Sequence, residues 1–180
     1  MNNRLVFPVL TLLFWTTSLG AQQAQDGPLI QNFGAVYTVD QADYPADPER
    51  TYKVVFDVAS GPDDPAQLNK AMNTLARFLN MHAQSGVPAK NLQVVAVLHG
   101  QASKHSLSDS AYRQRYGVDN PHTDLIRQLT DRGVQLYLCG QAMHARGFER
   151  SEVNEHIDVS LSAMTILIDL QANGYSLIRL

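Results

Sequence analysis

After residue 50 the hydrophobic pattern changes repeatedly between the spacing of strands and that of helices. Five segments have the apolar, β-branched or aromatic character of strands: Tyr52–Val58, Leu92–Leu98, Val134–Leu138, Ile157–Val159 and Tyr175–Leu180. In the longer ones, apolar residues follow one another almost without interruption. This is typical of strands that are buried on both faces.

Helical spacing occupies the intervals between these segments. Apolar residues recur every three or four positions from Leu68 to His82, with Asp64–Pro65 as the expected N-cap and first turn and Gly86 as the stop. Further helices are expected within Leu107–Tyr116, from Asn120–Pro121 to Gly133, early in Gln141–Glu155, and over Leu161–Ala172. Asn120 is interpreted as the N-cap of its helix. Strand–helix alternation predicts a parallel sheet covered by helices on both faces.

The first fifty residues follow a different pattern. Residues 1–20 run from a basic start through an apolar stretch to Ser18-Leu19-Gly20, the order of a secretory signal peptide with cleavage after Gly20. An uncleaved N-terminal anchor is the alternative. Residues 21–50 are polar and contain several prolines, so we interpret them as an arm or linker that lies on the domain or on a neighbouring subunit. The domain itself is expected over residues 51–180, in a periplasmic protein.

Composition narrows the range of partners. The chain has 14 basic and 17 acidic residues, a net charge of −3, and loss of Arg4 with the signal peptide would give 13 − 17 = −4. A nucleic-acid-binding protein would present a basic face. A polybasic patch for a membrane surface is also missing from the sequence. We therefore expect no nucleic-acid partner, and no membrane association after signal cleavage.

Cys139 is the only cysteine of the chain, so no internal disulfide can form. It directly follows a predicted strand and precedes the expected start of a helix. Thiolate is the reactive form of cysteine, and the N–H groups at a helix N-terminus stabilise it. The alternative is a small buried side chain at the strand end, because free cysteine is among the most buried residue types.

Two other polar residues stand at the ends of predicted strands. His99 ends an apolar run and is followed by Gly100, while Asp57 lies near the end of the first strand. In open parallel sheets ligands and chemistry collect beyond the carboxyl ends of strands. An imidazole there could take the thiol proton of Cys139 or be an ordinary edge histidine bonded to a main-chain carbonyl. Asp57 could orient His99, although its sequence context favours a role in capping the next turn.

Several common chemistries have no counterpart in the sequence. The spacing of His105, His144 and His156 relative to Cys139 fits no recognised zinc pattern. The sequence also has no phosphate loop, dinucleotide-binding glycine fingerprint or nucleophile elbow. No metal and no cofactor are therefore expected.

Several motifs together resemble the DsrE/DsrF-like sulfur-relay family, in particular its exported members. These are Lys53-Val-Val-Phe-Asp57, Val97-Leu-His99-Gly100, Asn120-Pro121, Gly133-Val-Gln-Leu-Tyr-Leu-Cys139-Gly140-Gln141 and Gly174-Tyr175-Ser-Leu-Ile. The resemblance implies a three-layer α/β/α domain with a central, mostly parallel five-stranded sheet, assembled into oligomers. In cytoplasmic sulfur-relay members, a cysteine at the position matching Cys139 accepts sulfane sulfur as a persulfide and passes it on. The resemblance implies the same role here, with a sulfur donor or acceptor protein as partner.

Two functions follow as hypotheses. In the first, the protein is a sulfur carrier, with Cys139 and His99 as candidate catalytic residues supported by Asp57, Gly100, Gly140 and Gln141. In the second, it is a non-catalytic oligomeric binding module in which Cys139 is a packing residue. Accessibility of the thiol distinguishes the two.

Overall fold

A computed structural model describes residues 23–180, so the predicted signal peptide lies outside the described residues. The five expected strands form one sheet: β1 (Tyr52–Val58), β2 (Leu92–Leu98), β3 (Gln135–Cys139), β4 (Asp158–Ser160) and β5 (Ser176–Arg179). Their order is β4-β3-β2-β1-β5, and every neighbouring pair is parallel. The predicted α/β fold with a central parallel sheet is confirmed.

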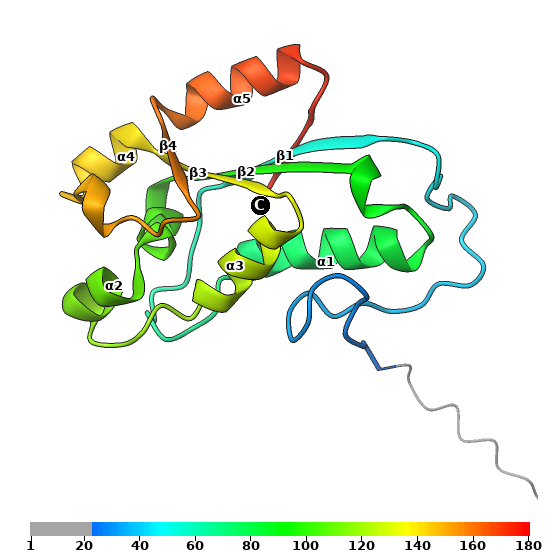
Figure 1. Cartoon of the computed structure of the whole chain (residues 1–180), viewed down its shortest axis with the longest axis horizontal. Coiled ribbons are helices and arrows are strands. Elements are labelled where there is room, and N and C mark those ends of the chain that lie inside the picture. Colours follow the sequence, from blue (N-terminus) through cyan, green and yellow to red (C-terminus); the bar gives the residue numbers. More distant parts are fainter. Residues whose placement is uncertain (1–22) are drawn as a thin grey trace, which may run out of the picture.

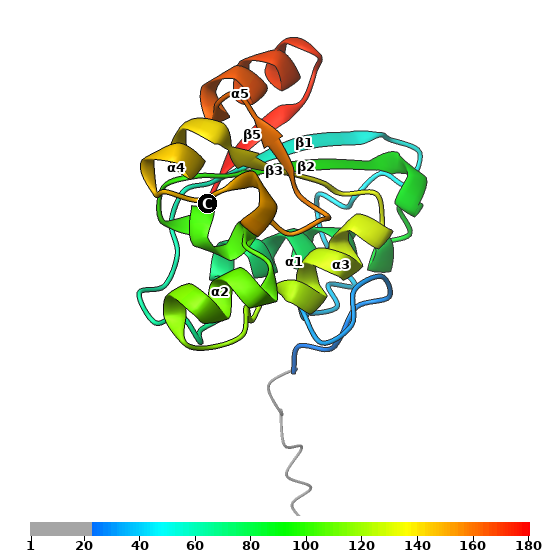
Figure 2. The ribbon, with the colours of Figure 1, turned by 60° about the vertical axis from the view of Figure 1, so that its left-hand side comes forward.

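Helices cover both faces of this sheet. They are α1 (Lys70–Gln84), α2 (Asp109–Tyr116), α3 (Thr123–Asp131), α4 (Gly140–Ala145) and α5 (Ala163–Ala172). Figures 1 and 2 show α1 and α3 on one side and α5 on the other. The main core lies between the sheet and α1 with α3, where Phe56, Leu98 and Leu138 are buried. Since side chains alternate along a strand, the residue next to each of these three in its own strand faces α5.

Two expected helix starts are wrong. α1 begins at Lys70 with Asn69 as its N-cap, because the Asn69 side chain accepts a hydrogen bond from the N–H of Ala71. Asp64 instead closes a separate turn by accepting from the N–H of Ala66 at 2.9 Å. A carboxylate that bonds its own backbone two residues on favours a turn over a helix.

Asn120 is likewise not the N-cap of α3, a position that His122 occupies. Its amide donates to the carbonyls of His105 and Leu107 at 3.0 and 2.7 Å, and its oxygen accepts from the His122 N–H at 3.0 Å. Asn120 therefore bridges two loops, using donors as well as the acceptor that a cap requires.

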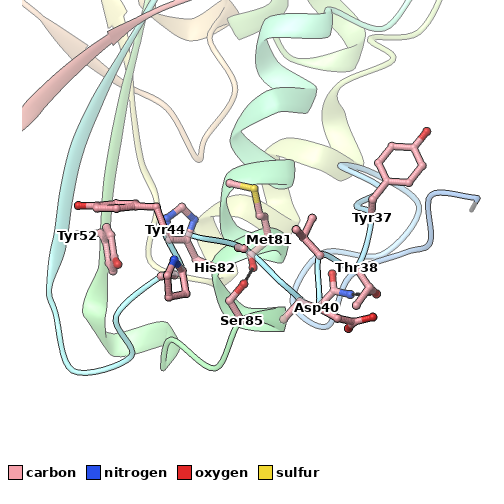
Figure 3. Close-up of a pocket in the computed structure, with 13 residues that line it drawn as sticks. Tyr37, Thr38, Asp40, Tyr44, Tyr52, Met81, His82 and Ser85 are labelled. Atoms are coloured by element: carbon pink, nitrogen blue, oxygen red, sulfur yellow. Dashed lines mark hydrogen bonds between the residues drawn. The ribbon is translucent and has the colours of Figure 1, made fainter.

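The arm lies on the domain, along α1 and α3. Ile30 is fully buried in the main core. Asn80, a buried residue of α1, accepts from the N–H groups of Leu29 and Ile30 and donates to the carbonyls of Ile30, Phe33 and Gly34. The later part of the arm passes the carboxyl end of α1, near His82 (Figure 3).

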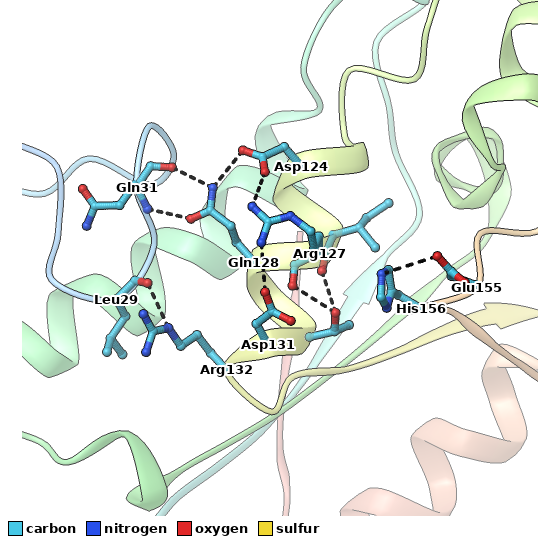
Figure 4. Close-up of polar contacts among 11 residues, drawn as sticks. Leu29, Gln31, Asp124, Arg127, Gln128, Asp131, Arg132, Glu155 and His156 are labelled. Carbon is cyan, nitrogen blue, oxygen red and sulfur yellow. Dashed lines mark hydrogen bonds and ion pairs between the residues drawn. The ribbon is translucent and has the colours of Figure 1, made fainter.

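Helix α3 also holds the arm. Gln128 and Gln31 exchange two hydrogen bonds between side chain and backbone, at 2.8 and 3.1 Å. Arg132 donates to the carbonyl of Leu29 at 3.1 Å, while Arg127 is paired within the helix to Asp124 (Figure 4). These bonds satisfy backbone N–H and C=O groups of the arm, which has no strand partner at these residues.

A buried histidine pair connects the loops at the carboxyl edge of the sheet. His105 and His122 have ring centroids 4.2 Å apart, and His105 is fully buried. The Asn69 backbone N–H donates to His122 Nε2 at 2.8 Å, which requires that this nitrogen carry no proton. Burial lowers the pKa of His105 to about 2 and that of His122 to about 3, with nearby positive charge as the smaller cause.

This pair should make the protein sensitive to acid. Both pKa values are below the ordinary 6.5, so the unfolded chain binds more protons and stability falls as pH drops from about 6.5 toward 3. At about 1.4 kcal/mol per pH unit for each histidine, the pair should lower the free energy of unfolding by roughly 4 kcal/mol between about pH 7 and pH 5. Urea unfolding at several pH values measures this slope.

His105→Leu should reduce the slope of the unfolding free energy against pH by the equivalent of about one proton. The reason is that the variant loses one of the two buried titrating groups. His144→Gln, which changes an exposed histidine of α4, is the matched control and should leave the slope unchanged. Equal slopes in wild type and His105→Leu would contradict the prediction.

Candidate functional site

Four consecutive strands bring polar side chains to one edge of the sheet. β3, β2, β1 and β5 are neighbours in that order. Asp57 lies near the end of β1, His99 directly follows β2 and Cys139 ends β3. These three residues therefore line one edge of the sheet. Arg179, at the end of β5, is a fourth member that the sequence analysis did not include.

The strand register places these side chains on the face covered by α5. Asp57 lies opposite Val97 on one side and Arg179 on the other. His99 is two residues beyond Val97 and its backbone is extended, so it continues the same alternation. Cys139 packs with Val97 on this face.

Asp57 is a buried carboxylate with two partners. Its side chain is in contact with solvent over 3 % of its surface. One oxygen accepts from His99 Nε2 at 2.5 Å and the other from Arg179 Nε at 3.2 Å. A carboxylate buried without partners would cost several kcal/mol. The structure thus has Asp57 orienting His99, and the capping role that the sequence context favoured is not what its side chain does.

His99 is held at one nitrogen and open at the other. Because a carboxylate oxygen accepts, Nε2 carries the proton of the bond to Asp57, which leaves Nδ1 for another partner. The side chain is 29 % exposed. Gly100 has φ +52°, and a Cβ there would lie 2.8 Å from the carbonyl oxygen of Ala59. Gly100 therefore permits the sharp turn after His99.

Cys139 is buried, with 6 % of its surface exposed. It packs with Val97 and with Ala163 of α5, and the half-buried Ile166 and Leu167 of the same helix complete the cover. Cys139 is the N-cap residue of α4, as expected, but its side chain makes no capping bond and the helix has only six residues. The exposure of the thiol is therefore determined by the packing of α5 over it.

The two residues after Cys139 hold the neighbouring loop. A Cβ on Gly140 would lie 2.6 Å from the Ser160 carbonyl oxygen, so this glycine permits the close approach of the chain between β4 and α5. Gln141 donates to the carbonyl of Leu161 at 3.5 Å. Both residues support the position of α5 above the thiol.

Arg179 was missed because its role depends on pairing between distant strands. The signal in the sequence was a basic residue within an apolar final segment. Among residues 23–180, no three histidine, cysteine, aspartate or glutamate side chains come together as a metal site. Nor is any helix of this range both long and apolar enough to cross a membrane. What the edge offers chemically is an oriented imidazole, a buried carboxylate paired with an exposed arginine, and a covered thiol.

Comparisons with known proteins agree with this fold. The sequence model of the DsrE/DsrF-like family matches residues 53–180. A protein of unknown function from Methanobacterium thermoautotrophicum has a similar structure, with TM-score 0.53 and 20% identity over 72% of this chain and 99% of that one. The ychN protein of E. coli gives TM-score 0.52 and 16% identity, again over 72% and 99%. No curated protein matches the chain by sequence.

Proposed function

The chain belongs to the DsrE/DsrF-like family, which is associated with sulfur relay, and from this premise we propose that it is a periplasmic sulfur carrier. In this proposal Cys139 accepts sulfane sulfur as a persulfide and passes it to a partner. The observation that supports it best is the placement of Cys139 and the Asp57–His99 pair on one face at one edge of the sheet.

The proposed chemistry needs no cofactor. The Cys139 thiolate attacks the terminal sulfur of a donor persulfide, a Cys139 S–S bond forms, and the donor's S–S bond breaks to release its thiolate. The terminal sulfur keeps its proton, so Cys139 ends as Cys–S–SH. An acceptor thiolate then attacks that outer sulfur and restores the Cys139 thiolate.

His99 would serve as the proton acceptor that generates the thiolate. Its bond to Asp57 fixes the ring, and the free Nδ1 is the nitrogen available to take a proton. Asp57 would act as a positioning residue that stabilises the imidazolium, and Arg179 holds the carboxylate from its other side.

The cover over Cys139 suits a carrier that reacts slowly with free sulfur donors and faster with a docked partner. Of the residues of α5, only Ala163 is buried. Leu161, Met164 and Ile168 expose their side chains on or beside the outside of this helix. A partner that binds this apolar surface could displace α5 and expose the thiol further, while in the free protein only 6 % of the surface of Cys139 reaches solvent.

The burial of Cys139 also favours the second hypothesis, a non-catalytic binding module. In that case the thiol contributes only packing against Val97 and Ala163. Reaction of the folded protein with a sulfur donor distinguishes the two functions, because a packing thiol reacts only after unfolding.

Incubation of the mature protein with polysulfide should add mass in increments of about 32 Da, one sulfur atom each, and alkylation should then trap the persulfide. Cys139→Ser should gain no mass and should keep its fold, since serine is close in size. His99→Gln and Asp57→Asn should slow the uptake by a factor of about a hundred, the lower end of the range for loss of a general base. Intact-protein mass spectrometry follows the reaction.

His156→Gln is the control for the histidine variant, because His156 is a partly exposed residue outside the edge described above. It should take up sulfur at the wild-type rate. If Cys139 gains sulfur only in denaturant, the sulfur-carrier proposal is wrong and the binding-module hypothesis replaces it.

We also propose that the protein is a homo-oligomer whose copies meet at the α5 surface, where a sulfur-transfer partner would take the place of the neighbouring copy. Leu177 and Ile178 of β5 are exposed along with the α5 residues. Exposed apolar side chains grouped on and beside one helix usually mark an interaction surface. β5 is in addition an edge strand, with one side free to pair.

Light scattering at micromolar concentration should give a multiple of the chain mass. Met164→Glu should convert the protein to a monomer, because a buried charge at an apolar interface is strongly unfavourable. Met81→Glu changes an exposed methionine at the end of α1 and should leave the assembly intact. A wild-type monomer would contradict this proposal.

The periplasmic location is proposed from the signal-peptide pattern of residues 1–20. N-terminal sequencing of the protein from a periplasmic fraction should begin at Ala21 or within a few residues of it. An intact Met1 on a cytoplasmic protein would contradict export.

A further inference from the structure

Arg179 uses only part of its guanidinium group within the protein. Its Nε donates to Asp57 Oδ2 at 3.2 Å, and within residues 23–180 this is the only hydrogen bond of the side chain. The Arg179 side chain is 83 % exposed. A guanidinium group has five N–H donors, so the two Nη nitrogens are free to bind a ligand. The bond to Asp57 also restrains the side chain, which reduces the entropy that ligand binding would cost.

The free Nη groups belong to the same row of side chains as the thiol. Continuing the register of β2 and β3 by one residue places His99 opposite Cys139. Asp57 bonds His99, and Arg179 is opposite Asp57 in β5. From β3 to β5 the row crosses β2 and β1, a separation of about 14 Å at about 4.8 Å per strand. Because Arg179 reaches back to Asp57 over about one strand spacing, some 10 Å remain between its guanidinium group and the thiol.

Helix α5 covers the thiol end of this row and leaves the arginine end open. Ala163, the first residue of α5, packs on Cys139 at the carboxyl edge of the sheet. The helix ends at Ala172, and the chain then enters β5 at the amino edge. Figure 1 shows this course, from beside α4 to the opposite end of the sheet. The exposed parts of His99 and Arg179 therefore form an open approach toward the thiol.

An open guanidinium group selects for a carboxylate. The planar fork of arginine matches the two oxygens of a carboxylate and forms two parallel N–H···O bonds with it. Asp57 cannot use the Nη groups in this way, because each of its oxygens already has a partner. The span of the row then sets the size of the ligand. A single amino acid spans about 3.5 Å, whereas a tripeptide spans about 10 Å.

We propose that the sulfur donor is the persulfide of a small peptide-like thiol, with a carboxylate about 10 Å from its outer sulfur that Arg179 binds. This inference rests on the sulfur-carrier proposal and names the donor class for the same site. The body of the donor lies over His99, and its outer sulfur reaches Cys139. A bond from Cys139 Sγ to the outer sulfur forms, the S–S bond of the donor breaks, and the donor leaves as a thiolate. The outer sulfur keeps its proton.

The test compares glutathione persulfide with the persulfide of glutathione diethyl ester, which has no carboxylate. Alkylation and intact-protein mass spectrometry measure the rate of sulfur uptake by the mature protein at several donor concentrations. Below saturation, the wild type should react at least about fivefold faster with the acid than with the ester, because hydrogen bonds to a charged group are lost in the ester. Arg179→Gln should reduce this ratio to about one, chiefly through weaker binding of the acid. Arg179→Gln also weakens the support of Asp57, but that effect slows both donors and cancels in the ratio.

Cysteine persulfide tests the span, since its carboxylate is too close to the sulfur to reach Arg179 and Cys139 together. Its rate should fall no more in Arg179→Gln than the rate of the ester does. Arg77→Gln is the matched control, because it removes the same charge from an exposed position of α1 on the other face of the sheet. It should keep the wild-type ratio of acid to ester.

The outcomes separate this inference from the carrier proposal. Equal rates with acid and ester in the wild type, or a ratio that survives Arg179→Gln, would overturn the inference and leave the carrier proposal standing. The same would follow if Arg77→Gln lowered the ratio as much, or if cysteine persulfide depended on Arg179 as strongly as glutathione persulfide. If the folded wild type took sulfur from none of these donors nor from polysulfide, the carrier proposal itself would be wrong and the inference would fall with it.

Discussion

The carboxyl edge of the sheet is organised by one buried carboxylate. Asp57 lies near the carboxyl end of β1 with almost no contact with water, and the fold must supply its partners. The parallel register supplies both, with Arg179 directly opposite in β5 and His99 just beyond the residue opposite in β2. A shift of either strand by one residue would move its partner to the other face. The ion pair therefore links the register of three strands to the orientation of the imidazole.

The strands were predictable from the sequence because their signal is local. β1 and β2 have the predicted boundaries, since each is an apolar run closed by polar or glycine residues. The start of α1 was misplaced because Asp64 and Asn69 are both good caps, and only tertiary contacts decide between them. Asn120 and Arg179 were misread or missed for a similar reason. The two carbonyls that bind the Asn120 amide are 13 and 15 residues away and the partner of Arg179 is 122 residues away, distances at which no local pattern gives a signal.

The candidate site could be predicted in position but not in burial. The carboxyl-end rule for parallel sheets placed Asp57, His99 and Cys139 together from the sequence. Whether the thiol reaches solvent depends on where α5 lies, and an apolar helix shows no preferred face in its pattern. Ala163 contacts Cys139 because β5 pairs with β1, which draws α5 back across the sheet.

In the proposed carrier, α5 would have a covering and a displaced position of different cost. Its inner side covers Cys139 with Ala163, Ile166 and Leu167, while Met164 and Ile168 already face solvent. Displacing the helix in the free protein would expose further apolar surface at about 25 cal/mol per Å². A partner that packs against the displaced helix would bury apolar surface on both sides of it. This burial would offset the cost of moving α5 away from the sheet. Access to the thiol would then be coupled to docking on α5, while the Asp57–His99 pair would keep its geometry, because strand register and not α5 holds it.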